Sequence, residues 1–221
     1  MQQHVADASG VRRTKSTGTG TSAGTGAGTG AGLSELCESS DVLLGFVNTT
    51  PHGSGPVELL GDSASLTAWL TGAGLMAADA AVTRADVVAA HELRAALCTV
   101  FLSRSGCEGS ADRLPEAEQY LARIAERYPL KLRITAEGCR PVPAQTGVLG
   151  AFAGLLGAAA DLASRGAWLR MKICKNPTCY SGFFDRTRNT SGLYCSTACS
   201  SQAAQRAYRN RIKDASCAQA S

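Results

Sequence analysis

The sequence predicts a mostly α protein in two parts: a helical N-terminal domain over residues 33–164, and a small four-cysteine C-terminal module over residues 165–213 that ends in a basic helix. Three observations predict this class. Apolar residues recur at helical spacing through much of the first part. Four of the nine cysteines lie in two close pairs in the second part. The charge also changes sign: residues 1–164 carry 12 Lys and Arg against 16 Asp and Glu, and residues 165–213 carry 10 against one.

Residues 1–32 and 214–221 are predicted to be tails. The run from Thr17 to Gly32 is almost wholly Gly, Thr and Ala. Such a run cannot bury enough apolar surface to offset the entropy lost on ordering, so we predict disorder there. It also occupies the place where a signal peptide would need an apolar segment. No window approaches the roughly 18 uninterrupted apolar residues of a membrane span, which argues against an integral membrane protein.

The helical domain is predicted to begin with a short apolar element and a capped helix. The apolar element covers residues 43–47 and stops before Pro51, because proline disfavours the helical conformation in the residue that precedes it. Asp62 or Ser63 is a suitable N-cap for the next helix. Thr83 and Asp86 then form a capping-box pattern at the start of a third helix.

Three further elements complete the predicted helical domain. Leu114-Pro115-Glu116 is typical of a helix start, with proline in the first turn. Leu130, Leu132 and Ile134 alternate with polar residues, which predicts a strand, one arm of a hairpin that turns at Glu137-Gly138. Residues 145–164 are rich in Ala, Gly and large apolar residues, which predicts a closely packed helix.

The C-terminal module is predicted to contain two short strands, at Met171-Lys172-Ile173 and Phe183-Phe184, followed by a helix from about Thr197 to Lys213 that Ser196 caps. Its cysteines have the spacing Cys174-x4-Cys179-x15-Cys195-x3-Cys199. Two close pairs separated by a hairpin-sized spacer are typical of tetrahedral Zn²⁺, and four thiolates would close its coordination sphere, which predicts a structural, zinc-ribbon-like module.

Two alternatives remain for these cysteines. They are four free thiols in a small core, or the ligands of an iron–sulfur cluster, although the usual cluster spacings are not matched. The other five cysteines are scattered, and their odd total does not fit a secreted disulfide scaffold. A metal site built from thiols predicts a reducing compartment, and we expect the protein in the cytoplasm.

The positive charge of the module predicts a polyanionic partner, nucleic acid first. Arg206, Arg209 and Lys213 follow the i, i+3, i+7 spacing of one helical stripe. The alternative is a solvated helix face without a partner. The predicted nucleic-acid-binding residues are Arg186, Arg188, Arg206, Arg209, Arg211 and Lys213.

Asn48, His52 and Arg94 are the candidate lining of a small-molecule pocket in the helical domain. An arginine on an apolar helix face needs an anionic partner, either a protein carboxylate such as Glu58 or Asp62, or an acidic ligand. The alternative is an internal hydrogen-bond network. We find no Ser/His/Asp order, no phosphate-binding glycine loop and no suggestive carboxylate pair, so the sequence does not point to an enzyme.

The module resembles the CGNR zinc finger in Cys174-Lys-Asn-Pro-Thr-Cys179, in Phe183-Phe-Asp-Arg-Thr-Arg-Asn189, in Tyr194-Cys195-Ser196 and in the arginine-rich helix that follows. The helical domain is similar to the ABATE domain that usually precedes this finger. That likeness lies in Leu44-Gly-Phe-Val-Asn48-Thr49, in Asp62 through Leu70 and in His91-Glu-Leu-Arg94. One departure concerns the motif that names the finger: Cys199 is followed by Ser-Ser-Gln instead of Gly-Asn-Arg.

The resemblance covers residues 41–213 and implies a stress-induced transcription regulator. Together with the residue patterns, it predicts a zinc-dependent DNA-binding regulator whose helical domain senses a small-molecule effector or forms a homodimer. The alternative is a biosynthetic enzyme or ligand-binding protein that uses the polar pocket, with the zinc module as scaffold. A protein-interaction adaptor is a third class, which an apolar face on the zinc knuckle would favour.

Overall fold

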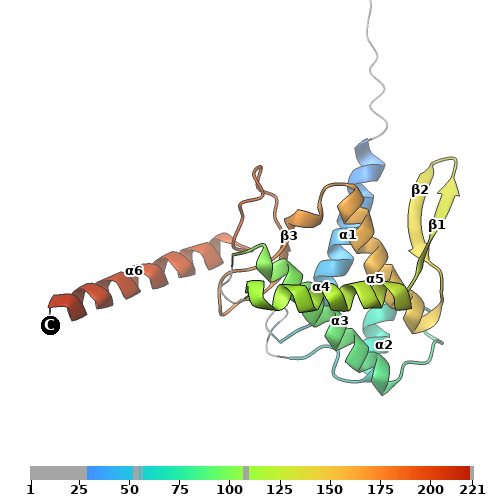
Figure 1. Cartoon of the computed structure of the whole chain (residues 1–221), viewed down its shortest axis with the longest axis horizontal. Helices are drawn as coiled ribbons and strands as arrows, with labels where there is room; N and C mark the ends of the chain where they lie inside the picture. The colour runs from blue at the N-terminus through green and yellow to red at the C-terminus, as the bar shows by residue number, and fades with distance from the viewer. Residues whose placement is uncertain (1–28, 52–54, 56, 107–109, 220–221) are drawn as a thin grey trace, which may run out of the picture.

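The computed structural model describes residues 29–51, 55, 57–106 and 110–219 (Figure 1). The helices of the first part are α1 (Thr29–Val47), α2 (Ser63–Gly72), α3 (Arg84–Ser103), α4 (Ser110–Arg127) and α5 (Gly147–Ser164), with strands β1 (Leu130–Thr135) and β2 (Gly138–Pro143) between α4 and α5. The second part holds the 3₁₀ turn η1 (Trp168–Arg170), strands β3 (Met171–Ile173) and β4 (Gly182–Phe184), and helix α6 (Thr197–Gln219). The predicted mostly α class is confirmed.

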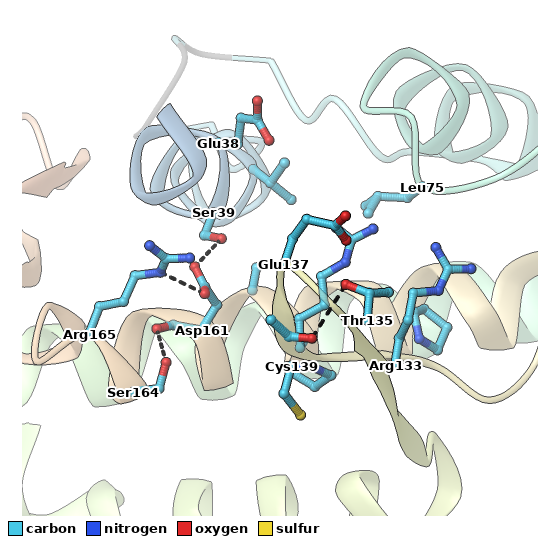
Figure 2. Close-up of a pocket in the computed structure, with 18 residues that line it drawn as sticks. Glu38, Ser39, Leu75, Arg133, Thr135, Glu137, Cys139, Asp161, Ser164 and Arg165 are labelled. Atoms are coloured by element: carbon cyan, nitrogen blue, oxygen red, sulfur yellow. Dashed lines mark hydrogen bonds and ion pairs between the residues drawn. The ribbon is translucent and has the colours of Figure 1, made fainter. Parts of the chain in front are cut away.

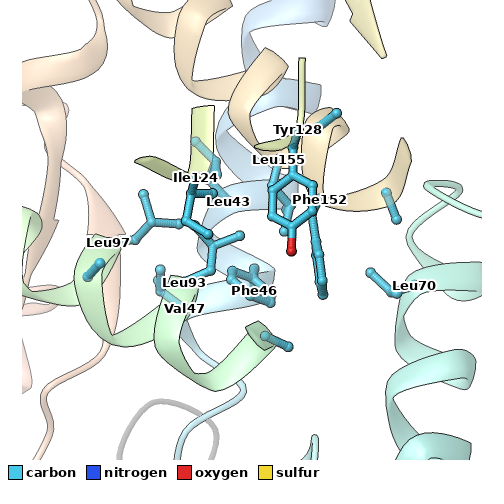
Figure 3. Packing of buried hydrophobic residues seen from close by; sticks show 14 of the residues in the cluster. Leu43, Phe46, Val47, Leu70, Leu93, Leu97, Ile124, Tyr128, Phe152 and Leu155 are labelled. Carbon is cyan, nitrogen blue, oxygen red and sulfur yellow. The ribbon is translucent and has the colours of Figure 1, made fainter. Parts of the chain in front are cut away.

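The core lies among α1, α3, α4 and α5. Figure 3 shows Phe46 of α1, Leu93 and Leu97 of α3 and Phe152 of α5 converging, all essentially inaccessible to solvent. The Phe152 ring also packs against Tyr128, with ring centroids 5.3 Å apart. Burying each such side chain contributes about 1.5–3 kcal/mol, so this cluster is the main source of stability for the domain.

Of the three helix starts predicted from capping or proline patterns in the helical domain, those of α2 and α3 are confirmed. The Asp62 carboxylate accepts the Ser65 amide at 2.8 Å, and the Thr83 hydroxyl accepts the Asp86 amide at 3.3 Å, each completed by a return bond. The third prediction is wrong by more than a turn, because α4 begins at Ser110 and Pro115 lies inside it. Leu114, which directly precedes that proline, packs against the core.

Helix α5 corrects the expectation about membrane spans. Its 18 residues have a mean hydropathy of 1.5, so by length and composition it is apolar enough to cross a membrane. In the fold this helix belongs to the core of the domain. Its residues Ala151, Phe152, Ala153 and Leu155 are fully buried, and the helix packs against α1 and β2. A core helix made largely of small residues passes the same length and composition test, which explains the discrepancy.

The predicted tails are shorter than expected where the structure describes them. Thr29 to Gly32 belong to α1, while residues 1–28 lie outside the described residues. At the other end α6 continues past Lys213 to Gln219. Helix α6 runs out from the body on the left of Figure 1, and the β1–β2 hairpin projects on the right. Every residue of α6 from Ala207 to Lys213 is exposed.

The cysteine module comprises residues 165–213. Its first part, η1 and β3, packs into the helical domain. Met171 and Ile173 of β3 belong to the common buried core. Ser105 donates a hydrogen bond to the Ile173 carbonyl, and Arg104 lies over the Trp168 ring, 4.5 Å from its centroid. The two parts therefore share one core through β3, and Phe184 of β4 packs against the same core.

Asn48 makes a second junction between the two parts. Its side-chain amide donates to the Gly182 carbonyl at 3.1 Å and accepts the Gly182 amide at 2.6 Å. This pairing imitates one step of a strand ladder and joins the end of α1 to β4. A Cβ on Gly182 would lie 2.6 Å from Cγ2 of the buried Val47, so the contact requires glycine.

Candidate metal centre and nucleic-acid interface

Four cysteine sulfurs converge at the root of α6. Cys174 follows β3, Cys179 ends the turn after it, Cys195 precedes α6, and Cys199 lies in the first turn of α6. All four Sγ atoms lie within 4.8 Å of one another, with 3.6 Å from Cys179 to Cys195 and 3.7 Å from Cys195 to Cys199. Tetrahedral zinc with Zn–S bonds of about 2.3 Å holds its sulfurs about 3.8 Å apart. The donor set and its spacing therefore fit a zinc ion.

Backbone hydrogen bonds fold the chain around these sulfurs. The Cys174 amide donates to Ser181 at 2.8 Å and the Lys175 amide donates to Leu193 at 2.8 Å, which brings the two cysteine pairs together. The Cys199 amide donates to the Ser196 hydroxyl at 3.3 Å, as the predicted cap requires. The cysteine ligands are thus set by the local fold of the module as well as by any bound ion.

Asn176 connects the first cysteine pair to α6. Its side chain is buried, and its amide nitrogen donates to Gln202 Oε1 at 2.9 Å. Its carbonyl oxygen accepts hydrogen bonds from Thr178 and from the Arg206 guanidinium. A hydrogen bond from Asn176 also lowers the pKa of Cys199 to about 7, while burial raises the pKa values of Cys174 and Cys195. Asn176 therefore braces the metal centre and the direction of α6 together.

The loop after β4 is fixed by a buried ion pair. Lys172 and Asp185 are 3% and 1% exposed, and Lys172 Nζ lies 2.8 Å from Asp185 Oδ2. The lysine also donates to the carbonyls of Thr190 and Gly192, and the carboxylate accepts the amides of Thr187 and Gly192. Burial alone would raise the pKa of Asp185, but the bonds from Lys172 and Thr187 outweigh it and hold that pKa well below its usual range.

The predicted nucleic-acid-binding residues fall into two groups. Arg209, Arg211 and Lys213 are exposed on α6, and Arg186 and Arg188 are exposed on the loop that Asp185 fixes. Arg206 is half-buried and bound to Asn176, so its guanidinium is engaged within the protein. Tyr208 and Ile212 are 60% and 48% exposed on a different stripe of α6.

Comparison with known families assigns both parts of the chain. Residues 40–166 match the ABATE family, whose description is "Putative stress-induced transcription regulator". The chain belongs to the ABATE family. Residues 170–212 match the CGNR zinc finger, which contains all four clustered cysteines. No curated protein that was compared matches the chain.

Two of the three residues predicted to line a pocket of the ABATE domain, Arg94 and Asn48, make contacts within the protein. Arg94 is 6% exposed and holds Glu58 with two parallel hydrogen bonds of 2.7 and 2.6 Å, and it also donates to Thr49 at 2.7 Å. The hydrogen bond from Arg94 lowers the pKa of Glu58. Asn48 is bound to Gly182 at the junction with the finger, and His52 lies outside the described residues.

A large cleft of the ABATE domain lies elsewhere, between α1, α5 and the hairpin (Figure 2). Its volume is about 670 Å³. Arg133 and Arg140 stand directly opposite each other on the hairpin and both line it. Gly154 and Gly157 lower the α5 side of the cleft, because neither carries a Cβ. The glycines of α5 were the only sequence signal for this cleft, and they also fit simple close packing.

Proposed function

We propose that the chain is a zinc-dependent DNA-binding transcription regulator that acts in the cytoplasm. One observation carries the proposal: four sulfurs at the spacing of tetrahedral zinc lie at the root of an exposed helix, and the charged residues of that helix from Arg206 to Lys213 are all cationic. The family assignment supports a regulator, and the finger match supports zinc as the metal.

In this proposal Cys174, Cys179, Cys195 and Cys199 hold one Zn²⁺, which folds the finger. Four protein ligands leave no open coordination position, so the ion is structural. Arg209, Arg211 and Lys213 of α6, with Arg186 and Arg188 of the loop, neutralise DNA phosphates. Arg206 stands apart, because its bond to Asn176 suits it to orienting α6 toward DNA.

The salt dependence of DNA binding tests this proposal. Glutamine at Arg209, Arg211 and Lys213 together should flatten the slope of log K against log salt by up to about 0.9 for each phosphate that the variant no longer neutralises. The zinc content should stay at one per chain, because none of the three residues touches a ligand cysteine. The measurement is fluorescence anisotropy with DNA fragments from beside the protein's own gene, over a salt series.

A charge-matched control is available in the ABATE domain. Glutamine at Arg84, Arg113 and Arg123, all exposed on α3 and α4, removes the same charge far along the chain from the finger. This control should keep the wild-type slope. Equal slopes for the α6 variant and the wild type would contradict the role of α6, and no binding by zinc-loaded wild type at low salt would contradict the proposed function.

A second candidate function, effector binding, is supported by the cleft of Figure 2. Like charges directly opposite on paired strands are destabilising, and neither Arg133 nor Arg140 has an ion-pair partner among the described residues. A small carboxylate or phosphate between them would relieve the repulsion. Such acids should raise the melting temperature of the wild type more than that of Arg133→Gln, and equal shifts in both proteins would contradict effector binding in this cleft.

A further inference from the structure

A second, smaller cleft lies where the helical domain meets the finger. Its volume is about 360 Å³, and one wall is the end of α5 with η1, while the other is β4 with the loop that follows it. Four arginines line it: Arg165 and Arg170 from the first wall, and Arg186 and Arg188 from the second. No carboxylate side chain is among its described lining residues. We call it the arginine cleft.

Arg170 is held in place at the centre of the arginine cleft. Its Nη1 donates to the carbonyls of Asp185 at 2.9 Å and Thr187 at 2.8 Å, which connects the two walls. A guanidinium carries five N–H donors, and these two bonds use only the pair on Nη1. The donors on Nε and Nη2 make no hydrogen bond to any other described residue. Because the side chain is already fixed, an anion that binds it costs little further side-chain entropy.

The neighbouring acids are committed elsewhere. Asp185 is the only acid between residues 165 and 213, and its buried carboxylate is paired with Lys172. Asp161 Oδ1 lies 2.7 Å from Arg165 Nε, so this carboxylate is paired with Arg165 and not with the other three arginines of the cleft. Arg170, Arg186 and Arg188 therefore present three cationic groups without a carboxylate partner in the described part of the chain. The loop that carries Arg186 and Arg188 is fixed on both sides by Asp185, through Thr187 and Gly192.

We propose that the arginine cleft binds a phosphate of the DNA backbone, so that the DNA interface includes the junction with the helical domain as well as the finger. The inference rests on the proposed DNA-binding function. Guanidinium groups bind phosphate through paired hydrogen bonds. Several of them around one concave site can therefore hold a single phosphate of the DNA backbone. DNA held here and on α6 would contact two separate parts of the chain.

The decisive variant is Arg170→Gln, because Arg170 belongs to the wall next to the helical domain and its charge has no carboxylate partner among the described residues. We expect this zinc-loaded, full-length variant to flatten the salt slope by about 0.9, the value for a single phosphate left without its cation. Arg188→Gln, on the opposite wall, should do the same. In the double variant the change in slope should be smaller than the sum of the two single-variant changes, because both residues would bind the same phosphate. Arg84→Gln, exposed at the start of α3, is the charge-matched control and should leave the slope unchanged.

Three other results would overturn the proposal, and they are distinguishable. If both single variants keep the wild-type slope while the α6 variant flattens it, the cleft is no DNA site and the proposed function stands. If zinc-loaded wild type does not bind DNA, both fail. If inorganic phosphate stabilises the wild type but not Arg188→Gln, and DNA binding is the same in both, the cleft takes free phosphate instead of DNA.

Discussion

Serine in place of Cys179 is expected to unfold the chain from Cys174 onward while α1 to α5 stay folded. Zinc binding supplies roughly 10–16 kcal/mol of apparent folding free energy in small four-ligand modules, so we expect its loss to outweigh the buried Lys172–Asp185 pair and the Asn48–Gly182 junction. The unfolding should stop at Ile173, because Met171 and Ile173 belong to the core of the helical domain. Amide hydrogen exchange followed by mass spectrometry measures both parts at once.

Cys139→Ser is the matched control for this prediction. Cys139 is exposed on β2 and lies outside the cysteine cluster, so its replacement should change neither zinc content nor exchange. Loss of protection in α3 and α5 of the Cys179→Ser variant would contradict an independently stable helical domain. Full protection of residues 174–213 without metal would contradict a metal-folded finger.

Alanine in place of Glu58 is expected to lower the free energy of unfolding by about 3 kcal/mol, measured by urea denaturation at pH 7. Removing one partner of a buried ion pair costs about 3–5 kcal/mol because the other charge stays buried and uncompensated. The Arg94 side chain is 7% exposed and that of Glu58 30%, which places the expected loss at the lower end. Glu126→Ala removes an exposed carboxylate of α4 and should change stability by less than about 0.5 kcal/mol. Equal losses in both variants would contradict the importance of the pair.

The same pair gives a pH dependence with a definite sign. Arg94 lowers the pKa of Glu58 from its ordinary value of 4.5. A carboxylate whose pKa is lower in the folded state stabilises the protein above its unfolded pKa, and this stabilisation is lost as the pH falls below about 4.5. Stability of the wild type should therefore fall more steeply than that of Glu58→Ala below that pH.

Local sequence patterns predicted most elements, because caps and strand alternation depend on neighbouring residues. The Thr83–Asp86 capping box and the start of α6 after Ser196 are examples. The contacts that join the two parts were not predictable in this way. Asn48 and Gly182 are 134 residues apart, and nothing near either one indicates the other. The sequence analysis identified Asn48 as a candidate pocket residue, but it did not predict the role of Asn48 at the junction.

The departure from the Cys-Gly-Asn-Arg motif has a structural explanation at its last position. Gln202 stands third after Cys199, where the motif has arginine, and its side chain accepts a hydrogen bond from Asn176. Arg206, one helical turn further, binds the other end of the same amide. These two residues brace α6 against the first cysteine pair. The pattern alone did not reveal this, because it depends on how the two cysteine pairs meet in space.

Zinc content and DNA affinity, measured on one sample through removal and return of the metal, test the central claim most directly. We predict one zinc per chain and salt-dependent DNA binding, loss of that binding when a chelator removes the metal, and recovery when zinc is returned. Zinc-loaded protein that fails to bind DNA at low salt, or metal-free protein that binds with unchanged affinity and slope, would contradict the claim.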